Sequence, residues 1–455
     1  MGQQSGYLVA IIGGGISGSE AAMQLSLRGI SSILFEQSHL PYGKIEEGLP
    51  KWHIKLRDQE ERKIDEKLKR SNICFVPGTS LGKEISLKEI LDWGVNAVLL
   101  AIGAGRDRRL NLPGIDDFIG KGLYYQNEFV SWFNQKHEPG FRGPECRVAD
   151  DALVIGGGLA SLDVVKILML ETVIEALDKA GIEMDLFTLE REGLPIVFKK
   201  LKVSLSELGL KGCTLYYRRR ISDMPLSPMP DNADQARKEK IYLLRQRILE
   251  NYRQKYLFQV QPCYSPVEYI SEGNVLQGLV FQKNEIQKGT WQSTKERKRV
   301  LSPLVISSVG SVPELLPEVP MEGNLLAIED LQTAKLAGFD NVFVMGNAVT
   351  GRGNIRESLV HSREITKRIM NSHLQVEEEE FEKWVNLEEA QSAQKIEQLI
   401  PELHQGKPLS QPKIDEILAR VRTLQEYRGY RGDYDLWIRE HLPIRLESLL
   451  AGNAG

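Results

Sequence analysis

The sequence predicts an α/β fold made of two units, each with a parallel sheet covered by helices. The prediction rests on one order of elements, strand, glycine-rich turn and helix, that occurs twice in the sequence. A buried apolar run, Leu8 to Ile12, leads into a glycine-rich turn and then a helix, and the same order recurs from Ala152 to Ile155 onward. Strand, glycine turn and helix in this order are typical of a βαβ unit, so we expect two Rossmann-like units in one chain.

The first turn, residues 13–18, has the spacing that binds the pyrophosphate of a dinucleotide. Gly13 permits the tight turn, Gly15 lets the backbone approach the phosphates, and Gly18 lets helix and strand pack closely. Ser17 lies in the same turn. The phosphates would sit at the positive end of the helix, where free N–H groups point outward.

Glu36 completes this first pattern. It directly follows a second apolar strand, Ser32 to Phe35, and is placed to accept hydrogen bonds from the adenosine ribose hydroxyls. FAD-binding two-domain reductases carry a similar glycine turn, followed by an acidic residue, near the N-terminus. The first unit is therefore expected to bind FAD.

The second turn contains Gly156 and Gly158, with Ser161 in place of the last glycine. Two strands are candidates for the one that follows its helix. The run from Asp185 to Leu189 ends in Glu190, which suits an unphosphorylated ribose. The run from Cys213 to Tyr217 ends in three arginines, whose guanidinium groups suit a 2′-phosphate and favour NADPH. The three are Arg218, Arg219 and Arg220.

Composition excludes several classes of protein. With 455 residues, 26% charged residues and a net charge of −4, the chain is not expected to bind nucleic acid. No apolar run is long enough for a membrane span and no signal peptide is evident, so we expect a cytoplasmic protein.

The four cysteines, at positions 74, 146, 213 and 263, form no CxxC pair. This spacing argues against a redox-active dithiol and against an iron–sulfur cluster or another metal site in the chain. Electrons from a bound flavin would therefore leave for an acceptor outside the chain.

Later segments complete the expected organisation. Residues 288–299 look like the basic tip of a hairpin, and Val342 to Met345 is expected to be the last buried strand of the first unit. Beyond Asn371 we expect a solvated linker and a small helical appendage, with a partner-binding arm as the alternative. Ile414, Ile417, Leu418 and Val421 have the spacing of one buried helix face.

Three short sequence motifs resemble those of a known family. They are Pro41-Tyr42-Gly43, Gly156 to Val164, and Tyr217 to Arg220 followed by Met224-Pro225. Over about residues 7–370 the chain resembles the FAD-containing NADPH–ferredoxin (adrenodoxin) reductases and the small subunit of NADPH-dependent glutamate synthase. The resemblance implies a discontinuous FAD-binding domain of residues 1–146 and 314–375. It implies an inserted NADP-binding domain of residues 147–313. Beyond the resemblance, residues 376–455 are expected to form a helical C-terminal extension.

The resemblance also implies site residues beyond the two fingerprints. His53 matches a histidine close to the flavin, where it would tune the flavin through a hydrogen bond. The further positions assigned to FAD are Gly43, Gly103, Gly346, Asn347, Gly353 and Ile355.

Three features depart from the family pattern. Asn347 stands where an aspartate commonly binds the ribityl chain, and Leu159 replaces an asparagine near the nicotinamide. The cysteine-rich iron–sulfur module of the glutamate synthase branch is lacking at the N-terminus, which favours a stand-alone reductase.

The expected activity is hydride transfer from NADPH to FAD, followed by transfer of single electrons to a ferredoxin-like iron–sulfur protein. An electron-input subunit of a larger oxidoreductase and a non-catalytic FAD-binding protein are the alternatives. Ferredoxins are usually acidic, so basic clusters are candidate docking surfaces. The candidates are Lys295, Arg297, Lys298 and Arg299 in one cluster, and Lys199, Lys200 and Lys202 in another.

Overall fold

The computed structural model describes residues 6–229, 233–287, 290–330, 333–346 and 375–452. Three positions that the resemblance assigns to FAD, namely Asn347, Gly353 and Ile355, lie outside the described residues.

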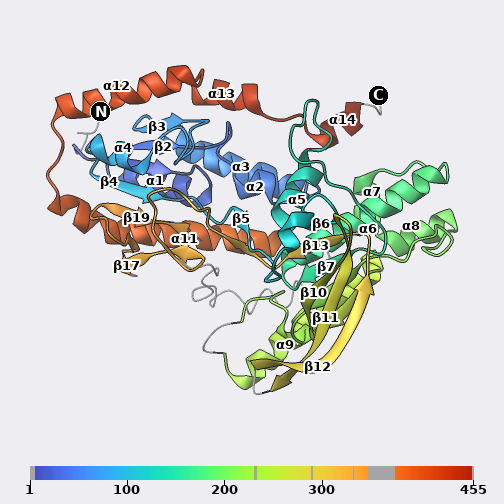
Figure 1. Cartoon of the computed structure of the whole chain (residues 1–455). Helices are drawn as coiled ribbons and strands as arrows, with labels where there is room; N and C mark the ends of the chain where they lie inside the picture. The colour runs from blue at the N-terminus through green and yellow to red at the C-terminus, as the bar shows by residue number, and fades with distance from the viewer. Residues whose placement is uncertain (1–5, 230–232, 288–289, 331–332, 347–374, 453–455) are drawn as a thin grey trace.

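The first sheet draws four strands from the first hundred residues and three from residues 328–344. They are β1 (Leu8–Ile12), β2 (Ser31–Phe35), β3 (Ile73–Val76), β4 (Ala97–Leu100), β17 (Ile328–Asp330), β18 (Lys335–Leu336) and β19 (Val342–Val344). Their order is β17-β18-β19-β4-β1-β2-β3, with β18 antiparallel to both neighbours and the run from β19 to β3 parallel (Figure 1). This sheet is discontinuous in sequence, as expected.

Both faces of the first sheet are buried, because successive residues of a strand point to opposite sides. Val9 and Ile11 pack against α1 (Ile16–Leu27) and α3 (Ile54–Leu68). The alternate residues of β1 pack on the other side with α4 (Leu87–Asp92). The continuous apolar run of β1 is thus a strand buried on both faces, which fixes the glycine turn that follows it.

The second sheet lies within residues 123–308. Its strands are β6 (Leu123–Tyr125), β7 (Leu153–Gly156), β8 (Thr214–Tyr217), β9 (Gln259–Pro262) and β13 (Val305–Ser308). They are all parallel, in the order β6-β13-β7-β8-β9. Although the sequence placed residues 1–146 in the first unit, β6 pairs with β13 and so belongs to the second sheet.

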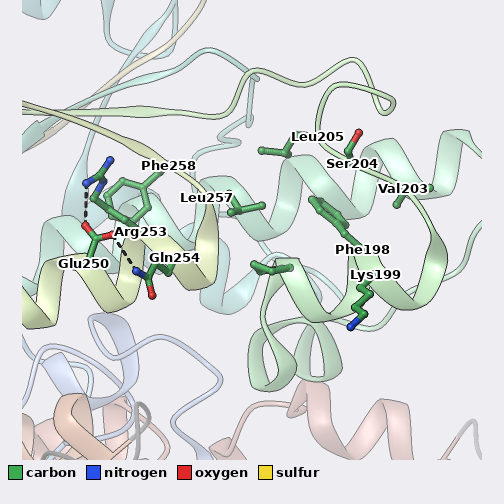
Figure 2. Close-up of a pocket in the computed structure, with 11 residues that line it drawn as sticks. Phe198, Lys199, Val203, Ser204, Leu205, Glu250, Arg253, Gln254, Leu257 and Phe258 are labelled. Carbon is green, nitrogen blue, oxygen red and sulfur yellow. Dashed lines mark hydrogen bonds and ion pairs between the residues drawn. The ribbon is translucent and has the colours of Figure 1, made fainter.

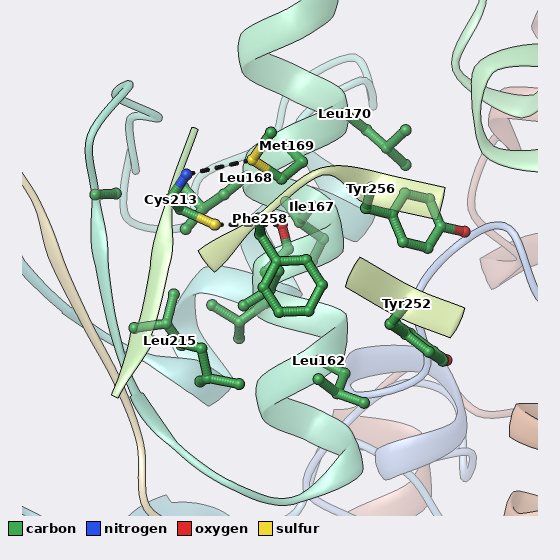
Figure 3. Close-up of a cluster of buried hydrophobic side chains, with 14 of the residues drawn as sticks. Leu162, Ile167, Leu168, Met169, Leu170, Cys213, Leu215, Tyr252, Tyr256 and Phe258 are labelled. Carbon is green, nitrogen blue, oxygen red and sulfur yellow. Dashed lines mark hydrogen bonds between the residues drawn. The ribbon is translucent and has the colours of Figure 1, made fainter. Parts of the chain in front are cut away.

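Helices α5 (Gln126–Gln135), α6 (Leu159–Lys179) and α9 (Gln235–Tyr256) pack around the core of the second unit, and Figure 3 shows part of that core. Leu162 of α6 and Leu215 of β8 are fully buried in it. The backbone N–H of Cys213 donates to the sulfur of Met169 at 3.3 Å. Burial raises the pKa of the Cys213 thiol, so this cysteine behaves as a core residue.

One predicted strand is a helix. Residues 185–189, expected to be a strand that ends in Glu190, belong to α7 (Leu186–Glu192), with α8 (Leu194–Leu201) directly after it. The Asp185 carboxylate caps α7 by accepting from the N–H of Thr188 at 2.9 Å. A short apolar run does not distinguish strand from helix, and here the cap decides.

A curved antiparallel sheet extends from the second unit (Figure 1). It consists of β10 (Tyr264–Glu272), β11 (Val275–Gln287) and β12 (Thr290–Leu301), with β11 in the middle. Residues 288–299 were expected to form a basic hairpin tip. The hairpin is present, but residues 290–299 lie along its second strand, β12, and not at its tip. The Phe281 ring of β11 stacks on Tyr216 of β8 at 3.9 Å and so anchors this sheet.

The C-terminal helices are part of the fold. They are α11 (Gln375–Gln405), α12 (Gln411–Tyr427), α13 (Tyr434–His441) and α14 (Leu446–Gly452). In Figure 1, α11 lies on one side of the first unit, and α12 and α13 run along the other. Ile417 and Val421 are fully buried against the first sheet, so the expected linker with a small appendage was wrong. None of the described helices is both long and apolar enough to cross a membrane.

Two short strands mark where the chain crosses between the units. β5 (Arg106–Asp107) pairs antiparallel with β14 (Ser311–Val312). The remaining short elements are α2 (Lys44–Glu47), β15 (Met321–Glu322), β16 (Leu325–Leu326) and the 3-10 turns at Ile115–Phe118 and Ile221–Asp223.

Candidate functional site

The first glycine turn is tightly packed on one side and open on the other. Gly13 has a φ of +101°, and a Cβ there would lie 2.5 Å from the oxygen of Ala101. A Cβ on Gly18 would lie 1.8 Å from the oxygen of Gly13. On Gly15, by contrast, a Cβ would meet no described atom within 4 Å. The turn therefore leaves room beside Gly15, at the start of α1, for an anionic group.

Ser17 has a partner that the sequence did not reveal. Its hydroxyl donates a 2.7 Å hydrogen bond to Oε2 of Glu388, a residue of α11 that is only 3% exposed. Burial raises the pKa of Glu388. Only the packing of α11 on α1 brings these two side chains together, and no spacing in the sequence signals it.

Glu36 is held against the glycine turn. Its Oε2 accepts from the N–H of Gly14 at 2.7 Å and its Oε1 from the N–H of Ser38 at 2.9 Å. The side chain is 5% exposed, and burial raises the pKa of Glu36 to about 7 despite these hydrogen bonds. Its position at the end of β2 is the one expected for a ribose-binding acid.

Two of the other predicted glycines, Gly103 and Gly346, lie at the same edge of the sheet as this turn. Gly103 follows β4 and Gly346 follows β19, and because these strands are parallel to β1 they end at the same edge of the sheet as Gly13. A Cβ on Gly346 would lie 2.4 Å from Oγ of Ser17. Gly43 and Gly103 both have positive φ, and a Cβ on either would meet no described atom within 4 Å.

His53 lies at the start of α3 and is 2% exposed. The neighbouring Trp52 packs into the core of the second unit, with its ring centroid 5.3 Å from that of Phe133. The segment that carries His53 therefore lies between the two units. Its role beside a flavin stays a prediction.

The second glycine turn is built in the same way. A Cβ on Gly158 would meet no described atom within 4 Å, whereas one on Gly156 would lie 2.4 Å from the oxygen of Ser308. The Ser161 hydroxyl accepts from the N–H of Gly158 and donates to the oxygen of Ser308, both at 3.2 Å. Serine in place of the last glycine is therefore accommodated by hydrogen bonds.

The three arginines follow β8, which pairs directly with β7. β8 is thus the second strand of this unit. Arg218 is exposed and Arg219 is half-buried, whereas the Arg220 guanidinium bonds to Asp223 at 3.1 Å. The amide of Asn284, a residue that sequence reasoning missed, donates to the oxygen of Arg218 at 2.9 Å and supports the start of this segment.

Glu190, the alternative to the arginines, lies in the core and not at a strand end. It is 4% exposed and forms a 2.8 Å ion pair with the buried Lys166. Lys255 lies 3.9 Å from the same carboxylate oxygen. A buried carboxylate paired in this way has a structural role and is not presented to a ribose.

A groove of about 650 Å³ lies between α8 and α9 (Figure 2). Phe198 and Leu257 contribute apolar walls, and Lys199 lines it as well. Leu257 and Phe258 directly precede β9, so the groove is at the amino ends of the parallel strands, opposite the glycine turn. Among the described residues, no cluster of three or more His, Cys, Asp or Glu side chains could hold a metal ion.

Each of the two sheets is mainly or wholly parallel, and in each one strand leads through an open glycine turn into a helix. This arrangement defines a chain with two Rossmann-like units. Residues 7–186 match the family described as pyridine nucleotide-disulphide oxidoreductase.

The probable NADPH:adrenodoxin oxidoreductase of Schizosaccharomyces pombe is 31% identical over 170 residues, which are 37% of this chain and 35% of that protein. The NADPH-ferredoxin reductase FprA of Mycobacterium leprae is 24% identical over 369 residues, covering 74% of this chain and 77% of the relative. The structure of Mycobacterium tuberculosis FprA in complex with NADPH superposes with a TM-score of 0.66 at 19% identity, covering 92% and 90% of the two chains. The family resemblance and the fold class inferred from the sequence are confirmed.

Proposed function

We propose that this protein is an FAD-dependent oxidoreductase that takes hydride from NADPH and passes single electrons to a ferredoxin-like iron–sulfur protein. One observation carries the proposal. In each unit one strand of the sheet leads into an open glycine turn. Beside the first turn lies Glu36, and beside the second lie the arginines that follow β8. The two sites therefore suit different dinucleotides.

In the first unit, the space beside Gly15 fits a pyrophosphate, and the ionised form of Glu36 can accept hydrogen bonds from ribose hydroxyls. When bound, FAD accepts a hydride and releases electrons singly, and so connects a two-electron donor to a one-electron acceptor. Asn347, Gly353 and Ile355 remain proposed contacts.

In the second unit, Gly158 and the start of α6 fit the pyrophosphate of NADPH. Arg218 and Arg219 are proposed to bind its 2′-phosphate, because their guanidinium groups form no ion pair with any described residue. Arg220 is held by Asp223 and contributes less. The burial of Glu190 also favours NADPH over NADH, since no other acid was a candidate for the ribose.

The acceptor is proposed to dock on β12, an exposed edge strand. Lys295, Lys298 and Arg299 are exposed along it, whereas Arg297 forms an ion pair with Glu268. Within the described residues these three cations have no ion-pair partner, and together they suit an acidic partner. The second cluster is weaker because Lys200 is paired with Glu192 at 2.7 Å.

The proposal is tested by mixing the FAD-loaded protein, NADPH and an acidic plant-type ferredoxin under anaerobic conditions and following the ferredoxin spectrum. NADPH-dependent ferredoxin reduction is expected, and exchange of Lys298 and Arg299 for glutamate should slow it without slowing flavin reduction. Flavin reduction without ferredoxin reduction, together with co-purification of a large oxidoreductase chain, would favour the electron-input subunit instead. Flavin that NADPH never reduces would favour the non-catalytic binding protein.

The domain limits are proposed from the sheets. The second unit would run from the crossing at β5 to the crossing at β14, and the first unit would include the rest of the described chain through β19 and the helices that pack on it. A cytoplasmic location is proposed, although the Schizosaccharomyces pombe relative is named as mitochondrial. Cell fractionation decides between the two compartments.

A further inference from the structure

Helix α5 lies between the two units. It follows β6 of the second sheet, and Phe129 and Phe133 on one of its faces are fully buried in the core of that unit. Two asparagines on the same helix contact the segment 44–51 of the first unit. This segment leads into Trp52 and His53, which lie between the units.

Asn134 binds only backbone groups of that segment. Its Nδ2 donates to the oxygens of Glu46 at 3.1 Å and Leu49 at 2.9 Å, and its Oδ1 accepts from the N–H of Lys51 at 3.0 Å. The side chain is 7% exposed. The asparagine amide thus holds three positions of the first unit from a helix that is anchored in the second.

Asn127 makes a second connection. Its Oδ1 accepts from Nζ of Lys44 at 2.7 Å, and its Nδ2 donates to the oxygen of Gly105 at 2.9 Å and to Oγ of Ser311 at 3.1 Å. Its backbone N–H donates to the carboxylate of Asp107. These partners include both chain crossings, because Asp107 lies in β5 and Ser311 in β14.

The two asparagines are seven residues apart, which is close to two helical turns and places them on one face of α5. Together they hold both ends of the segment, from Lys44 to Lys51. Removal of the Asn134 amide would leave backbone groups of the segment without their hydrogen-bond partner. Removal of the Asn127 amide would do the same for Lys44 and for the groups at the two chain crossings.

We infer that Asn127 and Asn134 are positioning residues that set the first unit's segment 44–51 in register with the second unit. The inference rests on the proposed function, in which hydride passes between dinucleotides held by the two units. Hydride transfer requires reacting atoms about 3–3.5 Å apart, and a misplacement of about 1 Å can lower the rate about 100-fold. Side chains that fix one unit against the other would therefore control the rate more than the binding of either cofactor.

The test uses the full-length, FAD-loaded protein in anaerobic stopped-flow reduction over a range of NADPH concentrations. For Asn134→Ala we expect a limiting rate at least about tenfold below that of the unmodified protein, with the NADPH Kd changed by less than about twofold. Reduction by dithionite, which needs no alignment of the two units, should be unchanged. Asn127→Ala, at a partly exposed position, is the second variant in case Asn134→Ala does not fold, and the same split is expected for it.

The matched control is Asn96→Ala. Asn96 also binds two backbone groups, the N–H of Leu8 at 2.9 Å and the oxygen of Lys407 at 3.2 Å, but it lies at the amino end of the first sheet. Its variant should keep the unmodified rate. If NADPH reduces the unmodified protein and both α5 variants react as fast as Asn96→Ala, the positioning role is wrong. If NADPH does not reduce even the unmodified protein, the proposed function fails and the positioning role fails with it.

Discussion

Gly15 and Gly18 illustrate how one residue type can serve two physical purposes within a single turn. A Cβ on Gly18 has no room, because the oxygen of Gly13 lies 1.8 Å away. A Cβ on Gly15 would meet no described atom within 4 Å, but it would occupy the space that the ligand needs. Substitution of Gly18 should therefore affect mainly stability, and substitution of Gly15 should affect mainly FAD affinity.

Exchange of Gly15 for alanine is expected to leave the stability of the FAD-free protein within about 1 kcal/mol of the unmodified value, because its φ of −60° is ordinary. FAD affinity should fall at least about tenfold, since the methyl group would lie where the pyrophosphate approaches. Gly18→Ala should instead destabilise the FAD-free protein by about 1–3 kcal/mol through overpacking. Flavin fluorescence titration and urea unfolding measure the two effects, and equal behaviour of the two variants would contradict the assignment.

Glu36 provides a pH-dependent prediction. Its pKa is raised from 4.5 to about 7 in the folded protein. The folded FAD-free state therefore binds more protons than the unfolded state between these values, and stability is lost as the pH rises from about 4.5 to about 7. Glu36→Gln removes this titration while keeping an acceptor for the N–H of Gly14.

Urea unfolding of the FAD-free protein and of Glu36→Gln at pH 5, 6, 7 and 8 measures the effect. The unmodified protein should lose about 2.5 kcal/mol relative to the variant across this range. Parallel pH profiles would show that Glu36 titrates normally.

At the scale of elements, local patterns were predictable and distant contacts were not. The sequence predicted the position of the two glycine turns, of Glu36 and of the arginines, because residues that are close in sequence define each of these features. Residues 185–189 were wrongly predicted as a strand, although Asp185 is a typical helix cap. Glu388 and Asn134 gave no local signal, since tertiary packing alone brings them to Ser17 and to segment 44–51.

The C-terminal helix α12 shows the same limit. The apolar spacing predicted a buried face that included Ile417, Leu418 and Val421, but not which surface it covers. In the structure Ile417 and Val421 are fully buried against the first sheet, and Leu418 is only half-buried.

Ile417→Ala should therefore lower the free energy of unfolding by about 2–4 kcal/mol, as expected for a fully buried side chain. Leu418→Ala, on the same helix, should cost less than about 1.5 kcal/mol and serves as the control. Urea unfolding of both variants checks this. A cost for Ile417→Ala no larger than for Leu418→Ala would show that α12 does not pack on the sheet in solution.

At the scale of the whole molecule, the two units are joined by more than their chain crossings. Helix α5 connects them through its asparagines, and the C-terminal end adds contacts beside the same segment. Arg445, just before α14, bonds to Glu46 at 2.5 Å and to Glu61 at 2.8 Å. Burial raises the pKa of Glu61 to about 8, although Arg445 opposes the shift. The segment 44–51 is thus held from both sides, which supports the positioning role inferred for Asn127 and Asn134.

The most direct test of this account is anaerobic stopped-flow mixing of the FAD-loaded protein with NADPH and, separately, with NADH. Bleaching of the flavin band at ~450 nm is followed in both reactions, because the cofactor supplies this signal. We predict fast bleaching with NADPH and slow bleaching with NADH, since arginines follow β8 and Glu190 is buried in the core. Faster bleaching with NADH would contradict the role of the arginines, and no bleaching with either would contradict the proposal that the two units cooperate in hydride transfer.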